Sequence, residues 1–364
     1  MKKIIYRFAL VLMGAFVLTS CSDDDNEKLV ICPEITNVTD GVYIICEGSY
    51  FSGVPGSLSY WDYTTNTMRN NLFVSINGRE LGGTPNDALI FGSKMYIATT
   101  DENRVEVVDA NTVKSLGYIE MPQPRKLTSS SDGYVYVTSY EGTVSRVDTT
   151  SLSVVAKSEK IGNNLEGITA LNGYLYVCNA WNSDYTYNTN VVKLNAPDLS
   201  KVKDIEVRSN PTRIINDGTN IYLQSTGNYG DIPSALQKID INDNVTVLTE
   251  GATYMAYYAN KIYYINSVYD ENGNATYSYS VYDLLTGEVT ALPVGNEVFS
   301  PCAIAVDPNT GVLYISSNEE GEYGKPSYTE PGYVVAYYDG AYTRFYTGVA
   351  PTSYVFKTSS HVSE

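Results

Sequence analysis

A tyrosine flanked by apolar residues recurs seven times along this 364-residue chain, and it constrains the fold more than any other feature. Each copy follows a turn such as Asp132-Gly133, and each precedes a second β-rich run that ends in an acid or an amide. The tyrosines are Tyr43, Tyr96, Tyr136, Tyr176, Tyr222, Tyr263 and Tyr314. The residues that end the runs are Asp62, Asp109, Asp148, Asn195, Asp240, Asp283 and Asp339. A repeat of about 40 to 50 residues made of short strands and turns is typical of a β-propeller. We therefore predict an all-β, seven-bladed β-propeller with four antiparallel strands in each blade.

The two ends of the repeat are predicted to close the ring. The first blade lacks an inner strand, because Val42 already opens its tyrosine-bearing second strand. Residues 352–357 match an inner strand, but no further blade follows them. Pairing these two segments would remove the exposed edges that an open array leaves. We expect the propeller to occupy residues 41–360, with the C-terminal strand joining blade one.

The N-terminus has the pattern of a bacterial export signal. Lys2 and Lys3 form a basic start, and an apolar run over residues 8–18 follows them. The segment Leu18-Thr19-Ser20-Cys21 resembles the lipobox of bacterial lipoproteins, which implies that Cys21 becomes the lipidated first residue. An ordinary cleaved signal with an incidental cysteine is the alternative. We predict a lipoprotein signal peptide over residues 1–20.

A polar, acidic tract follows the lipobox. Residues 22–27 have little to bury, and they resemble the surface-export signal of Bacteroidota lipoproteins. We expect residues 21–40 to serve as lipid anchor and linker, and the protein to sit in the outer membrane, facing the cell exterior. Removing the signal takes away three of 24 basic residues and none of 41 acidic ones, so the mature charge is near −20. This balance argues against nucleic acid and anionic lipid surfaces as partners.

Catalytic motifs are missing from the sequence. His361 is the only histidine and lies past the closing strand, which excludes histidine-based triads and histidine metal sites from the body of the fold. No glycine-rich phosphate motif is present. Asp270 opens a segment that loosely resembles a calcium loop, but the offset of Gly273 favours a hairpin turn instead. We predict a binding protein with no metal and no cofactor, not an enzyme. A lyase or another propeller enzyme is a third possibility.

Four cysteines remain after the lipobox, namely Cys32, Cys46, Cys178 and Cys302. They permit three disulfide connectivities, and their spacing favours none of them. The last three fall in predicted strands, which favours small buried hydrophobic side chains.

Insertions collect between the second and third predicted strands of five blades. They span residues 47–56, 180–189, 227–233, 269–277 and 319–331. Insertions gathered on one face of a repeat protein commonly mark the binding face. Aromatic residues on a Gly, Ser and Asn background suit such a face, since they combine rigid contact area with adaptable hydrogen bonds. The aromatic candidates for ligand contact are Tyr50, Trp181, Tyr185, Tyr229, Tyr269 and Tyr323. The repeat tyrosines are instead expected in the core.

Links from each outer strand to the next inner strand should reach the same face. Several contain a proline, which suits the first position of a strand because it needs no ladder partner. Polar residues just after these prolines would point towards the mouth of the central channel. The polar candidates are Asn86, Asp87, Arg125 and Arg213. For both arginines, a ligand role and a purely structural role remain open.

A family resemblance adds an expected function. The repeats resemble YncE-like propellers over essentially the whole mature chain. The opening GVYIICEGSY at residues 41–50, followed by GSLSYWD at residues 56–62, resembles gut Bacteroidota surface lipoproteins that include the BtuG-type cobalamin-capturing proteins. This resemblance implies binding of cobalamin (vitamin B12) or a related corrinoid and its delivery to a TonB-dependent outer-membrane transporter. A cell-surface propeller that binds a glycan or a protein is the alternative.

Overall fold

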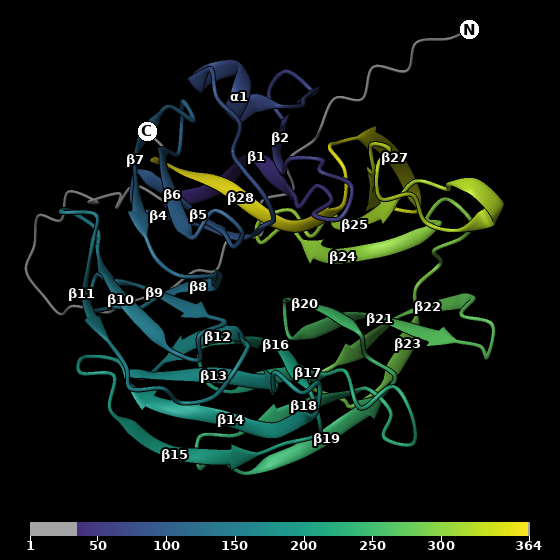
Figure 1. Cartoon of the computed structure of the whole chain (residues 1–364). Coiled ribbons are helices and arrows are strands. Elements are labelled where there is room, and N and C mark those ends of the chain that lie inside the picture. The colour runs from purple at the N-terminus through teal and green to yellow at the C-terminus, as the bar shows by residue number, and fades with distance from the viewer. Residues whose placement is uncertain (1–34, 363–364) are drawn as a thin grey trace, which may run out of the picture. The chain divides into compact units, whose positions relative to one another are not determined.

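Short strands joined by tight turns pair into seven four-stranded sheets in the computed structural model, which describes residues 35–362. The expected all-β, seven-bladed propeller is confirmed (Figure 1). Asn37–Ser360 form one compact unit. The predicted signal peptide, the lipidation site Cys21 and Cys32 lie outside the described residues. Among residues 35–362, no helix is long and apolar enough to cross a membrane.

The strands of each blade are given from the innermost to the outermost. Blade one contains β28 (Pro351–Val362), β1 (Ile35–Cys46), β2 (Ser57–Asp62) and β3 (Thr67–Arg69). Blade two contains β4 (Pro85–Phe91), β5 (Lys94–Thr99), β6 (Arg104–Asp109) and β7 (Ser115–Glu120). Blade three contains β8 (Pro124–Ser129), β9 (Val135–Ser139), β10 (Val144–Asp148) and β11 (Ser153–Lys157). Blade four contains β12 (Leu165–Leu171), β13 (Tyr174–Trp181), β14 (Tyr187–Asn195) and β15 (Lys201–Glu206).

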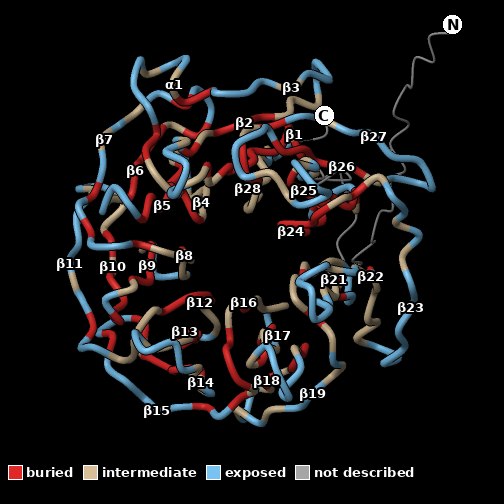
Figure 2. The backbone as a smooth tube through the Cα atoms, turned by 45° about the vertical axis from the view of Figure 1, so that its right-hand side comes forward, coloured by how far each residue is buried: buried red, intermediate tan, exposed pale blue. Residues whose placement is uncertain are grey.

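The remaining blades follow the same order. Blade five contains β16 (Pro211–Asn216), β17 (Ile221–Ser225), β18 (Ala235–Ile239) and β19 (Val245–Glu250). Blade six contains β20 (Tyr254–Tyr258), β21 (Lys261–Tyr269), β22 (Ala275–Asp283) and β23 (Val289–Ala291). Blade seven contains β24 (Ser300–Val306), β25 (Leu313–Asn318), β26 (Tyr333–Tyr338) and β27 (Ala341–Tyr346). The helix α1 (Leu72–Asn77) and the 3₁₀ turn η1 (Glu322–Gly324) lie in connections. Figure 2 shows that outermost strands such as β11 and β15 are largely exposed, whereas the middle strands are largely buried.

The ring closes as the sequence predicted, because β28 is the inner strand of blade one and pairs with β1. Both strands are longer than expected. β1 begins at Ile35, before the predicted start of the propeller at Gly41. The extension is held by side chains as well as by the ladder: the Ser359 hydroxyl donates to Asp40 Oδ1 at 2.8 Å, and the Ser360 hydroxyl donates to Asn37 Oδ1 at 2.7 Å.

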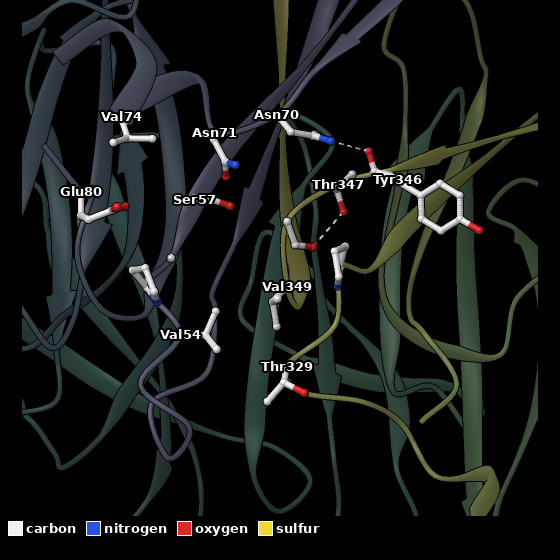
Figure 3. A pocket seen from close by; sticks show the side chains of 14 residues that line it. Val54, Ser57, Asn70, Asn71, Val74, Glu80, Thr329, Tyr346, Thr347 and Val349 are labelled. Carbon is white, nitrogen blue, oxygen red and sulfur yellow. Dashed lines mark hydrogen bonds between the residues drawn. The ribbon is translucent and has the colours of Figure 1, made fainter. Parts of the chain in front are cut away.

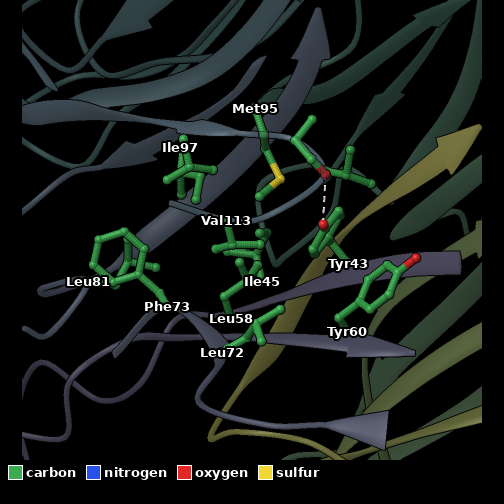
Figure 4. Packing of buried hydrophobic residues seen from close by; sticks show 13 residues of the cluster. Tyr43, Ile45, Leu58, Tyr60, Leu72, Phe73, Leu81, Met95, Ile97 and Val113 are labelled. Atoms are coloured by element: carbon green, nitrogen blue, oxygen red, sulfur yellow. Dashed lines mark hydrogen bonds between the residues drawn. The ribbon is translucent and has the colours of Figure 1, made fainter. Parts of the chain in front are cut away.

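The repeat tyrosines form the core, as predicted, and their hydroxyl groups also link neighbouring blades. Six of them are at most 5% exposed: Tyr43, Tyr96, Tyr136, Tyr176, Tyr222 and Tyr314. The Tyr43 hydroxyl donates to the Ala110 carbonyl of blade two at 2.8 Å (Figure 4). Tyr136 in blade three reaches the Ala196 carbonyl of blade four in the same way, at 3.0 Å. Blade six differs, because Tyr263 is only partly buried and the adjacent Tyr264 takes the buried position.

The acids that end the repeat are turn caps. Asp109 Oδ1 accepts the backbone N–H groups of Asn111 at 3.0 Å and Thr112 at 2.8 Å. Asp148 caps the corresponding turn of blade three in the same way. These donors lower the pKa of the Asp109 and Asp148 carboxyl groups, because they stabilise the charged form. A short carboxylate therefore caps the turn from the third strand to the fourth in blades two and three, whereas blade four has Asn195 at this position.

Inner strands begin with an irregularity that the sequence did not predict. The residue before the strand has a positive φ in five links, at Thr84, Gln123, Asn164, Asn210 and Ala350. In blades two, three, four, five and seven, the pairing of the inner strand then shifts register near its start. Such a bulge turns side chains away from simple alternation. These bulges therefore set the direction in which the polar side chains at the channel mouth point.

Two predicted loops are instead extensions of strands. In blade six, β21 and β22 pair as far as Tyr269 opposite Ala275, so only a short turn remains at the tip. Asp270 caps this turn by accepting the N–H groups of Asn272 at 2.9 Å and Asn274 at 2.8 Å. This confirms the predicted hairpin turn. In blade four, Trp181 pairs with Tyr187, which leaves residues 182–186 as the turn. The insertions of blades four and six therefore present their aromatic residues on β-hairpins.

Candidate ligand-binding face

The hairpin of blade four presents two predicted aromatic residues side by side. The Trp181 and Tyr185 rings are nearly parallel, at 7°, with their centroids 5.8 Å apart. Tyr185 has a φ of 65°, and this turn conformation directs its ring onto Trp181. Tyr185 is 77% exposed, so the pair offers a flat aromatic surface to solvent.

A network of amide side chains supports this hairpin. The Asn182 amide donates to Asn188 Oδ1 at 3.0 Å, and the Asn188 amide donates to Asn179 Oδ1 at 3.2 Å. The Asn163 amide, from the preceding link, donates to Asn182 Oδ1 at 3.1 Å. Sequence reasoning missed this network. The signal was the alternation of Asn188 and Asn190 along one strand, which places both amides on one face.

Tyr140, in the short turn of blade three, is a second residue that the sequence did not single out. Its ring meets Trp181 edge-on, with centroids 5.8 Å apart. The Arg125 guanidinium lies 4.3 Å from the centre of the Tyr140 ring. The Tyr140 hydroxyl donates to Glu166 Oε1 at 2.5 Å. Tyr140 therefore connects the aromatic pair of blade four to the charged groups at the channel mouth.

Those charged groups neutralise one another. Arg125 Nη2 lies 2.9 Å from Glu166 Oε1, and both side chains are under 15% exposed. Burial opposes ionisation of Glu166, but the charges of Arg125 and Lys126 outweigh it and hold the pKa of that carboxyl below its usual range. Burial raises the pKa of Glu47 at the same mouth, although both cations oppose the shift. The Nε atom of Arg125 is buried without a partner in the described part of the chain. One N–H group of the Arg125 guanidinium therefore makes no hydrogen bond with the described residues.

Blades five and six add further aromatic residues. The Tyr187 and Tyr229 rings lie 5.8 Å apart, and Tyr229 has a φ of 57° in its turn. Partial desolvation, followed by the nearby hydroxyls of Tyr187 and Tyr269, raises the pKa of Tyr229. Tyr187 and Tyr269 therefore both lie within electrostatic reach of Tyr229. Arg213 lies below them, with its guanidinium 4.3 Å from the centre of the Tyr254 ring and 3.2 Å from the Thr253 carbonyl oxygen.

The structure thus brings five aromatic residues of three consecutive blades onto one face. We call this set the aromatic face, and it consists of Trp181, Tyr185, Tyr187, Tyr229 and Tyr269. Two other predicted aromatics are exposed but stand apart from these contacts. Tyr50 is 71% exposed and packs edge-on against its neighbour Phe51. Tyr323 is 95% exposed in the connection of blade seven.

Two of the predicted polar contacts have structural partners. Asn86 is 1% exposed, and its amide donates to the Thr84 carbonyl at 3.0 Å and to the Thr100 hydroxyl at 2.8 Å. Asp87 accepts the Leu127 N–H and the Ser353 hydroxyl, each at 3.0 Å. These bonds link blade two to blades three and one. We therefore leave Asn86 and Asp87 out of the contact set that we propose below.

The thiols and acids of the described residues do not form a reactive cluster. Cys46, Cys178 and Cys302 are buried free cysteines, and burial raises the pKa of each thiol. Over residues 35–362, no group of three or more His, Cys, Asp or Glu side chains is arranged to hold a metal ion. What this face offers is contact area, amide hydrogen bonds and a neutralised ion pair.

A separate cleft of about 540 Å³ lies over blade one (Figure 3). It is bounded on one side by the connection after β1 and by the link that contains α1. Blade seven bounds the other side, through the connection between β25 and β26, the end of β27 and the link that leads into β28. None of the aromatic face residues lines it. None of the site residues that the sequence predicted lines this cleft.

Comparisons with known proteins identify a family and a fold, but they do not identify a ligand. A family model described as a domain of unknown function (DUF5074) matches residues 40–337. No curated protein matches the sequence. Among solved structures, a quinonprotein alcohol dehydrogenase-like protein from Bacteroides thetaiotaomicron superposes with a TM-score of 0.59 at 16% identity, over 90% of this chain and 78% of that chain.

Two further solved structures have the same fold. A 6-phosphogluconolactonase candidate from Bacteroides fragilis superposes with a TM-score of 0.60 at 13% identity, over 87% of this chain and 98% of that chain. The hydrazine synthase of Kuenenia stuttgartiensis gives 0.57 at 20% identity, over 69% of this chain and 76% of that chain. At these identities the likeness extends to the fold alone, and one fold hosts many functions.

Proposed function

This chain belongs to the family described as a domain of unknown function, DUF5074, and we propose from its own site that it captures a corrinoid such as cobalamin at the cell surface. The observation that carries the proposal is the aromatic face, which spans three blades. Tyr185, Tyr229 and Tyr269 are exposed, and the strand pairing of blades four and six holds Trp181, Tyr187 and Tyr269 on β-hairpins. A large, flat, partly apolar ligand would bury several of these rings at once.

Electrostatics favour a ligand that does not depend on strong charge attraction. The chain has a formal net charge of −17, and Arg125 at the channel mouth is already paired with Glu166. A corrinoid is bulky and close to neutral overall, and its amide rim would suit the Asn-rich hairpin of blade four. Arg125 and Arg213 are the candidate partners for the phosphate of its nucleotide loop.

Delivery to a TonB-dependent outer-membrane transporter is the second part of the proposal. It rests on the lipobox that ends in Cys21 and on the resemblance of the opening segment to corrinoid-capturing surface lipoproteins. A surface anchor would hold the aromatic face outside the membrane, where ligand is first met. In this role the protein binds and releases its cargo and performs no chemistry, so no cofactor, metal or enzymatic activity is proposed.

The test is direct binding of cyanocobalamin. The protein is mixed with cyanocobalamin, desalted and examined by visible absorption, and titration calorimetry then gives the affinity. We expect the corrin absorption to remain with the protein. Trp181→Ala and Tyr269→Ala should each weaken binding by about 2 kcal/mol or more if the ring is a central contact. Tyr118→Ala, on an outer strand of blade two with a 52% exposed ring, is the matched control.

The outcomes separate the two function classes. Retained colour that is lost in the Trp181 variant but kept in the Tyr118 variant supports corrinoid capture. No binding of cyanocobalamin at micromolar protein would contradict the proposal. The same aromatic surface would then favour the alternative, a propeller that binds a glycan or a protein, since aromatic platforms serve those ligands as well.

A further inference from the structure

The cleft over blade one has the dimensions of a small-ligand site. Its volume of about 540 Å³ lies within the range of roughly 300 to 1,000 Å³ that is usual for ligand pockets. It is open to solvent on one side, so a ligand would keep part of its hydration. Part of its wall is the link between β3 and β4, which contains α1. The other inter-blade links of the described residues contain no α-helix.

One wall of the cleft is polar, and two of its groups lack partners. Asn71 occupies the N-cap position of α1, yet it has a φ of 53° and its side chain does not cap the helix. Its carboxamide makes no hydrogen bond with any described residue and points into the cleft in Figure 3. Glu80 also projects into the cleft, and over residues 35–362 it takes part in no ion pair and no side-chain hydrogen bond. An N-cap residue normally bonds the helix it precedes, so this orientation leaves Asn71 available to a ligand.

A hydroxyl group and an open backbone position complete the polar wall. Ser57, at the start of β2, also lines the cleft. A Cβ atom built on Gly348 would lie 2.1 Å from the Ser57 Oγ atom, so a side chain at this position would displace that hydroxyl. Glycine at position 348 therefore leaves room for the Ser57 hydroxyl at the cleft wall.

The rest of the lining is mixed, because aliphatic side chains alternate there with Asn70, Thr329, Tyr346 and Thr347. Val54 and Val349 meet across the lower part of the cleft in Figure 3, and Val74 of α1 closes another side. The cleft thus sets neutral hydrogen-bonding groups and one carboxylate against aliphatic surface. Carbohydrates have this same division, because a sugar ring presents hydroxyl groups at its edge and C–H groups on its faces.

The charge of the lining narrows the ligand class. No Lys, Arg or His is among the described residues that line the cleft, and Glu80 is its only acid. A phosphate or carboxylate ligand would meet no cation there and would face an acidic protein. A neutral sugar would let Glu80 and Asn71 accept hydrogen bonds from adjacent hydroxyl groups, and bonds to a charged acceptor are the stronger kind.

We propose that the cleft over blade one binds a neutral carbohydrate unit, held by Glu80, Asn71 and Ser57 against the Val54, Val74 and Val349 surface. This site is separate from the aromatic face and does not rest on corrinoid capture. A surface propeller with both sites would bind a glycan and its main ligand at the same time.

Saturation-transfer NMR tests the proposal, with the methyl glycosides of glucose, galactose, mannose and N-acetylglucosamine as probes. We expect saturation transfer from the full protein to at least one glycoside at millimolar concentration. Glu80→Gln should weaken that binding about tenfold, since a lost hydrogen bond to a charged group is worth roughly 1.5 kcal/mol or more. Asn71→Gly removes the carboxamide while allowing the positive φ. Glu120→Gln, at the exposed end of β7, is the control and should bind as the parent protein does.

The proposal is overturned if none of the four glycosides receives saturation, or if both cleft variants bind as well as the control. It is also overturned if choline binds in a Glu80-dependent manner while the glycosides do not, because the cleft would then be a site for organic cations. Cyanocobalamin binding should be unchanged in the cleft variants. Failure of the glycan site and failure of corrinoid capture are therefore distinguishable.

Discussion

Asp307 should be one of the residues that most stabilises the ring, because its carboxylate joins the last blade to the first. It is 0% exposed in the turn between β24 and β25. Its Oδ1 atom accepts the Thr39 hydroxyl of β1 at 2.7 Å, and its Oδ2 atom accepts the Tyr63 hydroxyl of blade one at 3.0 Å. The same carboxylate also caps its own turn, through the N–H groups of Asn309 and Thr310.

Asp307→Ala leaves the two hydroxyl groups of blade one without their charged acceptor. Each such bond contributes about 1.5 to 3 kcal/mol, so the free energy of unfolding should fall by about 3 to 6 kcal/mol. Asp217→Ala is the matched control, because Asp217 caps the equivalent turn of blade five. It accepts the N–H groups of Thr219 and Asn220 and the hydroxyl of Tyr222, all in its own blade. The effect at Asp307 should exceed the effect at Asp217 by about 1.5 to 3 kcal/mol, which is the worth of one further charged bond.

Urea unfolding measures this difference, and the chain provides a local reporter. Only two tryptophans are present, and the Trp61 ring of blade one packs on Phe345 of blade seven with ring centroids 3.6 Å apart. In a Trp181→Phe background, tryptophan fluorescence therefore follows the closing interface alone. We expect the Trp61 signal of Asp307→Ala to change at lower urea than in the parent. Losses that agree within about 0.5 kcal/mol for Asp307→Ala and Asp217→Ala would refute this account of ring closure.

Four further predictions follow from charge, contact and anchoring. The pKa of Glu166 is held below the ordinary glutamate value of 4.5, so the stability that it contributes is complete above that pH and is lost as the pH falls below it. Glu166→Gln should therefore flatten the acid side of a plot of melting temperature against pH. Burial raises the pKa of Glu47, so its charged form is unfavourable in the folded state, and Glu47→Gln should raise the melting temperature at pH 7, where an unchanged value would contradict the assignment. Cyanocobalamin affinity should change little between 50 mM and 500 mM salt, and a steep loss would point to charge-driven binding instead. Cys21→Ala should move the protein from the membrane fraction to the soluble fraction without loss of binding, and retention in the membrane would exclude the lipid anchor.

The number of blades and the closure of the ring could be predicted because both follow from residues that do one job in every blade. A tyrosine such as Tyr136 fills the core and reaches the next blade with its hydroxyl, so it must recur at each second strand. A short acid or amide ends each third strand, and an acid such as Asp148 caps the turn that follows. Blade six shows the limit of the pattern. Tyr263 and Tyr264 are adjacent there, and the alternation along a strand decides between them only once the register is known.

The candidate site was harder to predict, because its contacts join blades that are far apart in the sequence. Tyr140 lies in the shortest kind of connection, and nothing near it indicates that Trp181 will meet its ring. The amides of Asn163 and Asn182 likewise bond only because the link and the hairpin converge. The aromatic candidates were easier to place, since Tyr185 and Tyr269 lie in insertions between second and third strands, and these connections all reach the same face of a propeller.

The polar candidates show how a small backbone irregularity changes the use of a residue. Counting from the proline places both Asn86 and Arg125 at the channel mouth, one residue after a strand has begun. A bulge at that point redirects each side chain, so Asn86 turns inward to Thr100 while Arg125 turns across to Glu166. Charges and amides that are satisfied in this way have little binding energy left for a ligand, because a new hydrogen bond must replace an existing one. Exposed rings such as Tyr185 have no such bond to lose, so contact with a ligand is gained in full. The energy of capture should therefore come from the aromatic hairpins, with the channel mouth serving to hold the blades that carry them.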